Sequence, residues 1–173
     1  MSNRFWATLV PTLLAGATCA RAEQGLIVHK ALSLDMAMAI TQGALEKCRA
    51  ENYQCAVTVL DATGRTIIAL QDDGAQLHRF DVSRKKAYTA LVYRKPSKEV
   101  VEGWSAKTAS SRPLVEGTMP NPPIEGTIDM GGGLPILVGR EVIGAVAVSG
   151  APGWEMDEAC AKAGLARVAD KLK

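Results

Sequence analysis

The stretch over residues 130–153 constrains the fold of this chain more than any other, because it has the pattern of two strands joined by a tight turn. Two largely apolar runs, Leu134–Val138 and Glu141–Ser149, flank Gly139, and short turns that contain glycine are typical of β-hairpins. The second run is apolar on both faces, which indicates a strand in the middle of a sheet. We therefore predict a hairpin here, followed by a turn and a helix over about 155–172.

The remaining chain alternates between helical and strand patterns. Ser33 is a suitable N-cap for a helix, Gly64 suits the turn of a first hairpin, and Pro96 ends a helix. We predict a helix over 34–50, strands over 55–60 and 65–71, helices over 80–93 and 97–106, and a proline-rich loop over 107–125. Helices at both ends of antiparallel strands predict a single α+β domain.

The first 22 residues have the pattern of a secretory signal peptide. Arg4 precedes a short apolar core, and Ala20 and Ala22 place small residues at a cleavage site. The core contains Pro11 and is too short to cross about 30 Å of hydrocarbon, so no stable membrane span is expected. We predict a periplasmic or secreted domain of residues 23–173, cleaved near Ala22.

The charge of the processed chain argues against nucleic acid as a partner. Cleavage removes two arginines and no acid, which leaves 18 basic and 18 acidic residues. A domain with no net charge and no arginine-rich stripe has no field that attracts nucleic acid. The chain also lacks a Gly-x-Ser-x-Gly elbow and the usual zinc-binding motifs, so no dedicated catalyst is indicated.

Three cysteines follow the cleavage site. Cys48 and Cys55 flank a short connection between a helix and a strand, so a disulfide between them is one alternative and two free thiols are the other. Cys160 lies among alanines and is expected to be a small buried residue.

Several of these segments resemble a known family. Residues 130–165, which run from Met-Gly-Gly-Gly-Leu-Pro through Ser-Gly-Ala-Pro-Gly to Asp-Glu-Ala-Cys-Ala-Lys-Ala-Gly-Leu, resemble the C-terminal half of the GlcG/HbpS family of haem-binding domains. They are also similar to the C-terminal domain of PduO-type proteins. Residues 55–75 and 83–90 are similar to the first half of the same family.

The resemblance covers roughly residues 30–170 and implies a fold, an assembly and a ligand. The implied fold is one α+β domain in which an antiparallel sheet of about five strands is flanked by helices, a profilin-like or PAS-like layer. The implied assembly is a homo-oligomer. The implied cofactor is haem or a related tetrapyrrole.

His29 is the first candidate for an axial ligand of the haem iron. It resembles the position of an N-terminal histidine that is associated with haem in the family, and histidine is a common haem ligand. The alternative is a histidine that packs beside the first helix. The other histidine, His78, lies beside Arg79 in a polar segment, where a solvated loop residue is expected.

Basic residues, a methionine and a glycine triplet complete the predicted haem site. Arg84 and Lys86 belong to the densest basic region, and haem propionates need such partners, although a solvated helix face is the alternative. Met130 is a further candidate for contact with the iron or the ring, or else a core residue. The triplet consists of Gly131, Gly132 and Gly133. It allows close approach of the backbone to a ligand or forms a plain turn, and no P-loop motif follows it.

The turn at 149–153 is expected to border the same pocket. Asp157 and Glu158 follow it at the start of the last helix, where acids complement the helix dipole. The function predicted from all this is an exported protein that captures, buffers or senses haem. Two alternatives are an accessory or sensory module that binds a small organic acid or a partner protein, and a weak enzyme that degrades haem or turns over a small acid.

Overall fold

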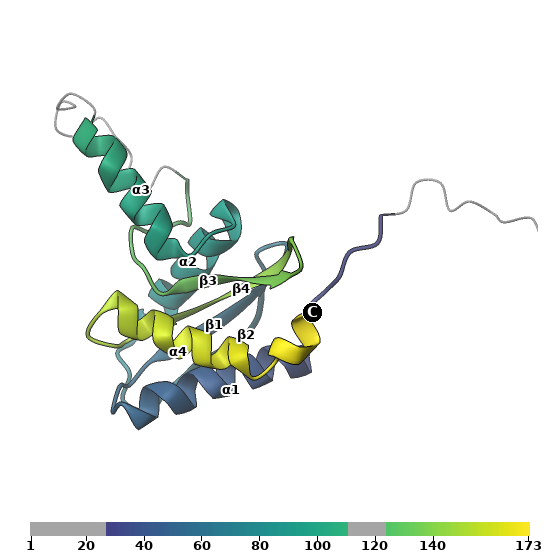
Figure 1. Ribbon diagram of the computed structural model, residues 1–173. Coiled ribbons are helices and arrows are strands. Elements are labelled where there is room, and N and C mark those ends of the chain that lie inside the picture. Colours follow the sequence, from purple (N-terminus) through teal and green to yellow (C-terminus); the bar gives the residue numbers. More distant parts are fainter. Residues whose placement is uncertain (1–26, 111–123) are drawn as a thin grey trace, which may run out of the picture.

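The computed structural model describes residues 27–110 and 124–173, so the predicted signal peptide lies outside the described residues. In chain order the elements are α1 (Leu34–Ala50), β1 (Ala56–Asp61), β2 (Thr66–Gln71), α2 (His78–Tyr93), α3 (Ser97–Ser110), β3 (Gly133–Val138), β4 (Glu141–Ser149), α4 (Trp154–Ala166) and a final 3-10 turn (Ala169–Leu172) (Figure 1). These elements confirm the predicted α+β domain, and α1 has the predicted bounds.

Three details differ from the prediction. Helix α3 continues to Ser110, where a loop was expected from residue 107, because no proline interrupts the chain before Pro113. Helix α4 ends at Ala166, because the backbone at Val168, with φ −121° and ψ 7°, leaves the α-helical conformation and continues as a 3-10 turn. The sheet of the described residues has four strands instead of about five, since residues 124–132 form turns and add no strand.

The sheet is antiparallel with the order β2-β1-β4-β3. The predicted central strand β4 does lie in the middle, where Ser149 at its end pairs with Ala56 at the start of β1. On its other side β4 pairs with β3, and Gly133 lies opposite Ala147. The end of β4 therefore meets the start of β1 and of β3 at one end of the sheet.

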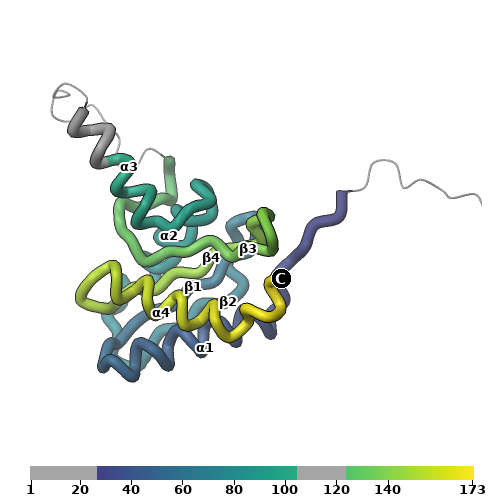
Figure 2. The backbone as a smooth tube through the Cα atoms, in the orientation of Figure 1, coloured from purple at the N-terminus to yellow at the C-terminus, as the bar shows by residue number. Residues whose placement is uncertain are grey.

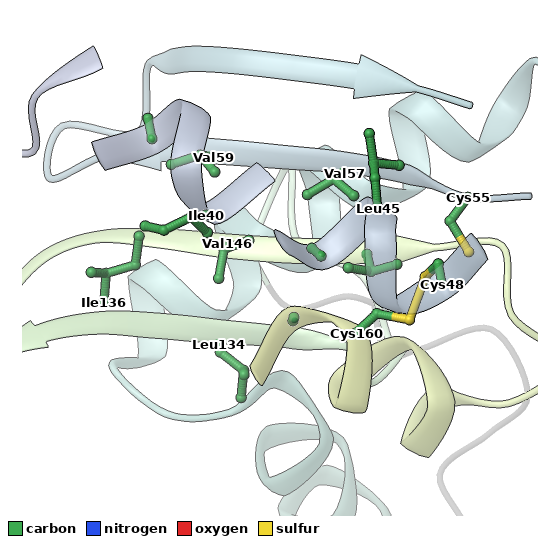
Figure 3. Packing of buried hydrophobic residues seen from close by; sticks show 14 of the residues in the cluster. Ile40, Leu45, Cys48, Cys55, Val57, Val59, Leu134, Ile136, Val146 and Cys160 are labelled. Atoms are coloured by element: carbon green, nitrogen blue, oxygen red, sulfur yellow. A yellow bond between two sulfur atoms is a disulfide. The ribbon is translucent and has the colours of Figure 1, made fainter. Parts of the chain in front are cut away.

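Helices cover both faces of the sheet (Figure 1). Helices α1 and α4 lie side by side on one face and α2 lies on the other, while α3 points away from the sheet (Figures 1 and 2). Alternation along the strands explains both cores, because successive side chains point to opposite faces. The α1/α4 face buries large residues, such as Ile40, Val57, Val59, Val146 and Val148 (Figure 3). The α2 face buries Leu60, Ala87, Ala90, Ala145 and Ala147, most of which are alanines, so α2 lies close to the strands.

A disulfide joins Cys48 of α1 to Cys160 of α4, with 5.6 Å between the two Cα atoms (Figure 3). Cys55 is a buried free thiol. The suggested Cys48–Cys55 pairing is therefore wrong. Cys160 is buried, as predicted, at 1% exposure, but as the disulfide partner of Cys48. The physical reason is that α1 and α4 pack along each other, which brings two residues 112 positions apart within disulfide range.

No helix of the described residues combines the length and apolar character that crossing a membrane requires.

Candidate functional site

A cleft of about 540 Å³ opens where β4 ends and helices α2 and α4 begin. This volume lies within the range of roughly 300–1,000 Å³ that is usual for small-molecule sites. Its lining consists of His78, Arg79, Val82, Lys86, Met130, Ser149, Gly150, Ala151, Pro152, Gly153, Trp154, Glu155 and Asp157. The turn between β4 and α4 therefore borders the cleft, as the sequence predicted.

A buried ion pair forms one wall of the cleft. The Lys86 Nζ atom donates a hydrogen bond to Asp157 Oδ2 at 2.6 Å, and each side chain is 3% exposed. Lys86 also donates to the Val148 carbonyl at 3.3 Å, and Asp157 Oδ1 accepts the Ala151 N–H at 3.0 Å. The pair thus ties α2 to α4 and to the turn that precedes α4.

Burial dominates the ionisation of both partners. It lowers the pKa of the Lys86 ammonium, and the neighbouring Asp157 charge offsets this only in part. It likewise raises the pKa of the Asp157 carboxyl against the opposing pull of Lys86. Since the ammonium is committed to Asp157, Lys86 lines the cleft without offering a free charge.

Two glycines of the triplet, Gly132 and Gly133, pack against the residues of this ion pair. A Cβ atom on Gly133 would overlap the Lys86 carbonyl oxygen, and one on Gly132 would lie 2.8 Å from Asp157 Cβ. Gly132 also has a φ of +111°, which side chains with a Cβ rarely adopt. The Gly133 N–H donates to Ser97 Oγ at 2.8 Å. The triplet therefore permits close packing of β3 on α2 and of the preceding loop on α4, and a direct contact with a ligand stays a prediction.

The structure brings two of the predicted haem contacts, Lys86 and Met130, to the cleft. Arg84 does not belong to its lining. His29 lies at the other end of β4, where its Nδ1 atom is 3.7 Å from Glu141 Oε1 and its side chain is 73% exposed. The length of β4 from Glu141 to Ser149 is about 26 Å at the usual strand rise, so His29 is remote from the cleft within one chain.

Sequence reasoning missed several lining residues, among them His78, Arg79 and Trp154. His78 was expected in a solvated loop, but it is the first residue of α2, and Arg79 follows it. A usable signal was Asp81, because acids favour the first turn of a helix and so place its start before Phe80.

These side chains together offer groups that suit a tetrapyrrole. The imidazole of His78 and the thioether of Met130 are both types of haem-iron ligand. The Trp154 side chain supplies an aromatic face, and Arg79 supplies a guanidinium for an acidic substituent.

Exposed apolar residues also occur next to the cleft in the sequence. Trp154 lines the cleft with 39% exposure, whereas Leu77, Phe80 and Met156 adjoin lining residues along the chain without belonging to the lining. The apolar contribution to the lining therefore comes from Val82, Met130, Ala151, Pro152 and Trp154.

Comparisons with known proteins place this chain in a family. Residues 32–166 match the family model described as haem degrading protein HbpS-like. A 15.0 kDa protein of Citrobacter freundii from the dhaT-dhaS intergenic region, described as uncharacterized, is 30% identical over 130 residues, which are 75% of this chain and 84% of that protein.

Solved structures agree with the fold. A double mutant of Streptomyces reticuli HbpS superposes with a TM-score of 0.70 at 26% identity, over 92% of this chain and 97% of that one. A complex of PduOC with heme superposes with a TM-score of 0.67 at 22% identity, over 80% of this chain and 95% of that one.

Proposed function

We propose that this chain, which belongs to the HbpS-like family, binds haem or a related tetrapyrrole in the cleft between α2 and α4. The observation that carries the proposal is the convergence of an imidazole, a thioether and an indole on one cleft. The predicted roles in capturing, buffering or sensing haem follow from such binding.

The donor set of the cleft fits a flat apolar ring with acidic substituents. His78 is exposed and begins α2, so its imidazole is accessible to an iron at the cleft mouth. Met130 is partly buried in the cleft wall, where its thioether meets a ring face or the iron. When bound, haem supplies an iron centre with redox and ligand-binding chemistry, while the protein supplies the ligands, the orientation and the shielding from water.

The N-terminal signal and the assembly belong to the same proposal. Processing near Ala22 would release residues 23–173 into the periplasm or the medium. Assembly into a homo-oligomer would give His29 a role that one chain does not allow. A second copy whose β3–β4 turn reaches the cleft would bring its exposed imidazole to the same haem.

Haemin titration of residues 23–173, followed by the Soret absorption band, tests the proposal. We expect saturable binding at micromolar haemin. His78→Ala is expected to shift the Soret maximum and weaken binding, since it removes an iron ligand of the cleft. His29→Ala removes the other histidine of the chain, at the far end of β4, and tests whether a second copy contributes an imidazole to the site.

The outcomes distinguish a site within one chain, a site shared between copies, and the absence of a haem site. Loss of binding in His78→Ala alone supports a site within one chain. Loss in both variants, with a native mass above that of a monomer, supports a site shared between copies. Absence of saturable haemin binding in the folded wild-type protein refutes the proposal.

A further inference from the structure

The geometry points to a carboxylate-binding subsite in the cleft, formed by the Ser149 hydroxyl, the Arg79 guanidinium and the first turn of α4. The carboxylate has two sources, a propionate of haem or a free small organic acid. The first source rests on the proposed haem binding, and the second does not.

The Ser149 hydroxyl is the first observation. Its side chain is fully buried, and its Oγ atom has no hydrogen-bond partner among the described residues. Buried hydroxyls are nearly always paired, so an unpaired one indicates a missing partner. The Ser149 hydroxyl is therefore a buried hydrogen-bond donor without an acceptor among the described residues.

The direction of this hydroxyl follows from the strand. Ala145 and Ala147 of β4 face α2, and Ser149 comes two residues later, so its side chain points to the same face. That face carries the α2 residues of the cleft, including Arg79 and Val82. The unpaired hydroxyl consequently points toward the cleft rather than into the α1/α4 core.

Arg79 provides a positive charge that no ion pair uses within the part of the chain that the structure describes. The lining acids pair with lysines, Asp157 with Lys86 and Glu155 with Lys98, which lies outside the lining, the latter at 2.9 Å. The charge of Arg79 acts on the Asp157 carboxyl at longer range, but among the described residues its guanidinium forms no ion pair with either acid. A guanidinium binds a carboxylate through two parallel hydrogen bonds, which makes it the better partner for a planar acid than a point charge.

The start of α4 adds backbone donors. Gly153 caps this 13-residue helix without a side-chain hydrogen bond, and the cleft is lined by Gly153 and Trp154. The Met156 N–H already donates to the Gly153 carbonyl at 3.2 Å and the Glu155 N–H to its own carboxylate, so the donors that the start of α4 offers are those of Gly153 and Trp154. The helix dipole favours an anion there. A carboxylate in the cleft would therefore meet a hydroxyl, a guanidinium and a helix N-terminus from three segments of the chain.

A binding experiment on haem-free protein tests the small-acid source. Acetate and glycolate are titrated into residues 23–173 at constant ionic strength and followed by amide NMR shifts, with acetamide and chloride as controls for size and charge. We expect saturable shifts of the amide signals of residues 149–157 with acetate and glycolate, and none with acetamide or chloride. Ser149→Ala and Arg79→Gln are expected to weaken binding about tenfold or more, because each removes a charge-assisted hydrogen bond.

Two matched control variants remove the same chemical groups, a buried hydroxyl and a guanidinium, at positions outside the subsite. Ser83→Ala removes a buried hydroxyl on the same face that is already bonded to Thr58 Oγ1 at 2.7 Å. Arg65→Gln removes an exposed arginine at the β1–β2 turn, at the opposite end of the sheet from Ser149. Neither is expected to change carboxylate binding.

Haemin and its dimethyl ester test the propionate source. If a propionate occupies the subsite, haemin binds more tightly than the ester, Ser149→Ala removes that difference, and acetate competes with haemin. If haemin and ester bind alike and acetate still binds, the subsite holds a small acid. If no carboxylate of either kind distinguishes wild type from Ser149→Ala, the inference is overturned, whether or not haemin binds. Carboxylate binding without haemin binding would instead refute the proposed function and leave the subsite standing.

Discussion

Replacing Lys86 by methionine is expected to lower the free energy of unfolding by about 3–5 kcal/mol, the usual result of removing one partner from a buried ion pair. The Asp157 carboxylate would remain 3% exposed, with the Ala151 N–H at 3.0 Å as its remaining hydrogen-bond partner among the described residues. Single domains are stable by about 5–15 kcal/mol, so this one change removes a large share of the total.

A second change restores part of this loss. In the double variant Lys86→Met with Asp157→Leu neither charge of the buried pair is left, and apolar replacements of buried ion pairs are often neutral or stabilising. Asp157→Leu does leave the Ala151 N–H without its acceptor, which costs about 1–3 kcal/mol. We expect the double variant to be more stable than Lys86→Met, with the two effects far from additive because the side chains touch.

The dependence on pH has a definite sign. Burial raises the folded-state pKa of Asp157 above its ordinary value of 3.8, so the folded protein holds this proton more tightly than the unfolded chain. This group's contribution to stability is therefore fully present below pH 3.8 and is lost as the pH rises through the folded pKa. Lys86→Met removes the attraction that opposes this shift, so its stability, relative to the double variant, should rise more steeply on acidification than that of the wild type.

Urea unfolding, followed by far-UV circular dichroism at several pH values, measures these differences. The double variant serves as the control, because it removes both titrations while other acids still contribute. A loss of less than about 1 kcal/mol in Lys86→Met, or additive losses in the double variant, would refute the reasoning, since either result means that the pair is not buried and coupled.

Three further predictions concern the same layers. Ser149→Ala should leave the haem-free protein as stable as the wild type or more stable by up to about 1 kcal/mol, whereas Ser83→Ala, which breaks a formed hydrogen bond, should destabilise it by about 1 kcal/mol in urea titrations. Gly133→Ala should lower stability by about 1–3 kcal/mol or more and reduce the Tm in a thermal melt, because its Cβ would overlap the α2 backbone. Reduction of Cys48–Cys160, which closes a long loop, should cost about 2–5 kcal/mol, measured as the shift of the urea midpoint on adding a thiol reductant.

Local pattern was sufficient to predict most of the elements. Apolar spacing and the Ser33 cap predicted α1, and the structure shows the Ser33 Oγ atom accepting the Met36 N–H at 3.2 Å. The apolar run of β4 likewise predicted its central place in the sheet. These features depend on neighbours a few residues away, so sequence periodicity reports them directly.

The contacts of the cleft could not be predicted in this way. Lys86 was expected to present a free charge, but its partner Asp157 lies 71 residues further along the chain. Cys48 was considered with the nearby Cys55, while its true partner lies on another helix. Pairings between residues so far apart in the sequence depend on how the helices pack on the sheet, and the local spacing of apolar residues does not report that packing.

His78 and Ser149 illustrate a second reason. His78 seemed a solvated loop residue because its neighbours are polar, yet the start of α2 places it at the cleft. Ser149 was predicted at the end of a strand, in the turn that borders the pocket, but the lack of a hydrogen-bond partner for its buried hydroxyl depends on all the residues that surround it in space. The chemical importance of both residues comes from their surroundings in space.

The most direct test of the account is an amide NMR map of residues 23–173 with and without ferric haemin, whose unpaired electrons broaden the signals of nearby amides. The account predicts that signals of residues 78–86 and 149–157 are lost first in each chain. Signals that vanish instead around residues 139–142 alone, or no change at all, would contradict haem binding in the cleft between α2 and α4.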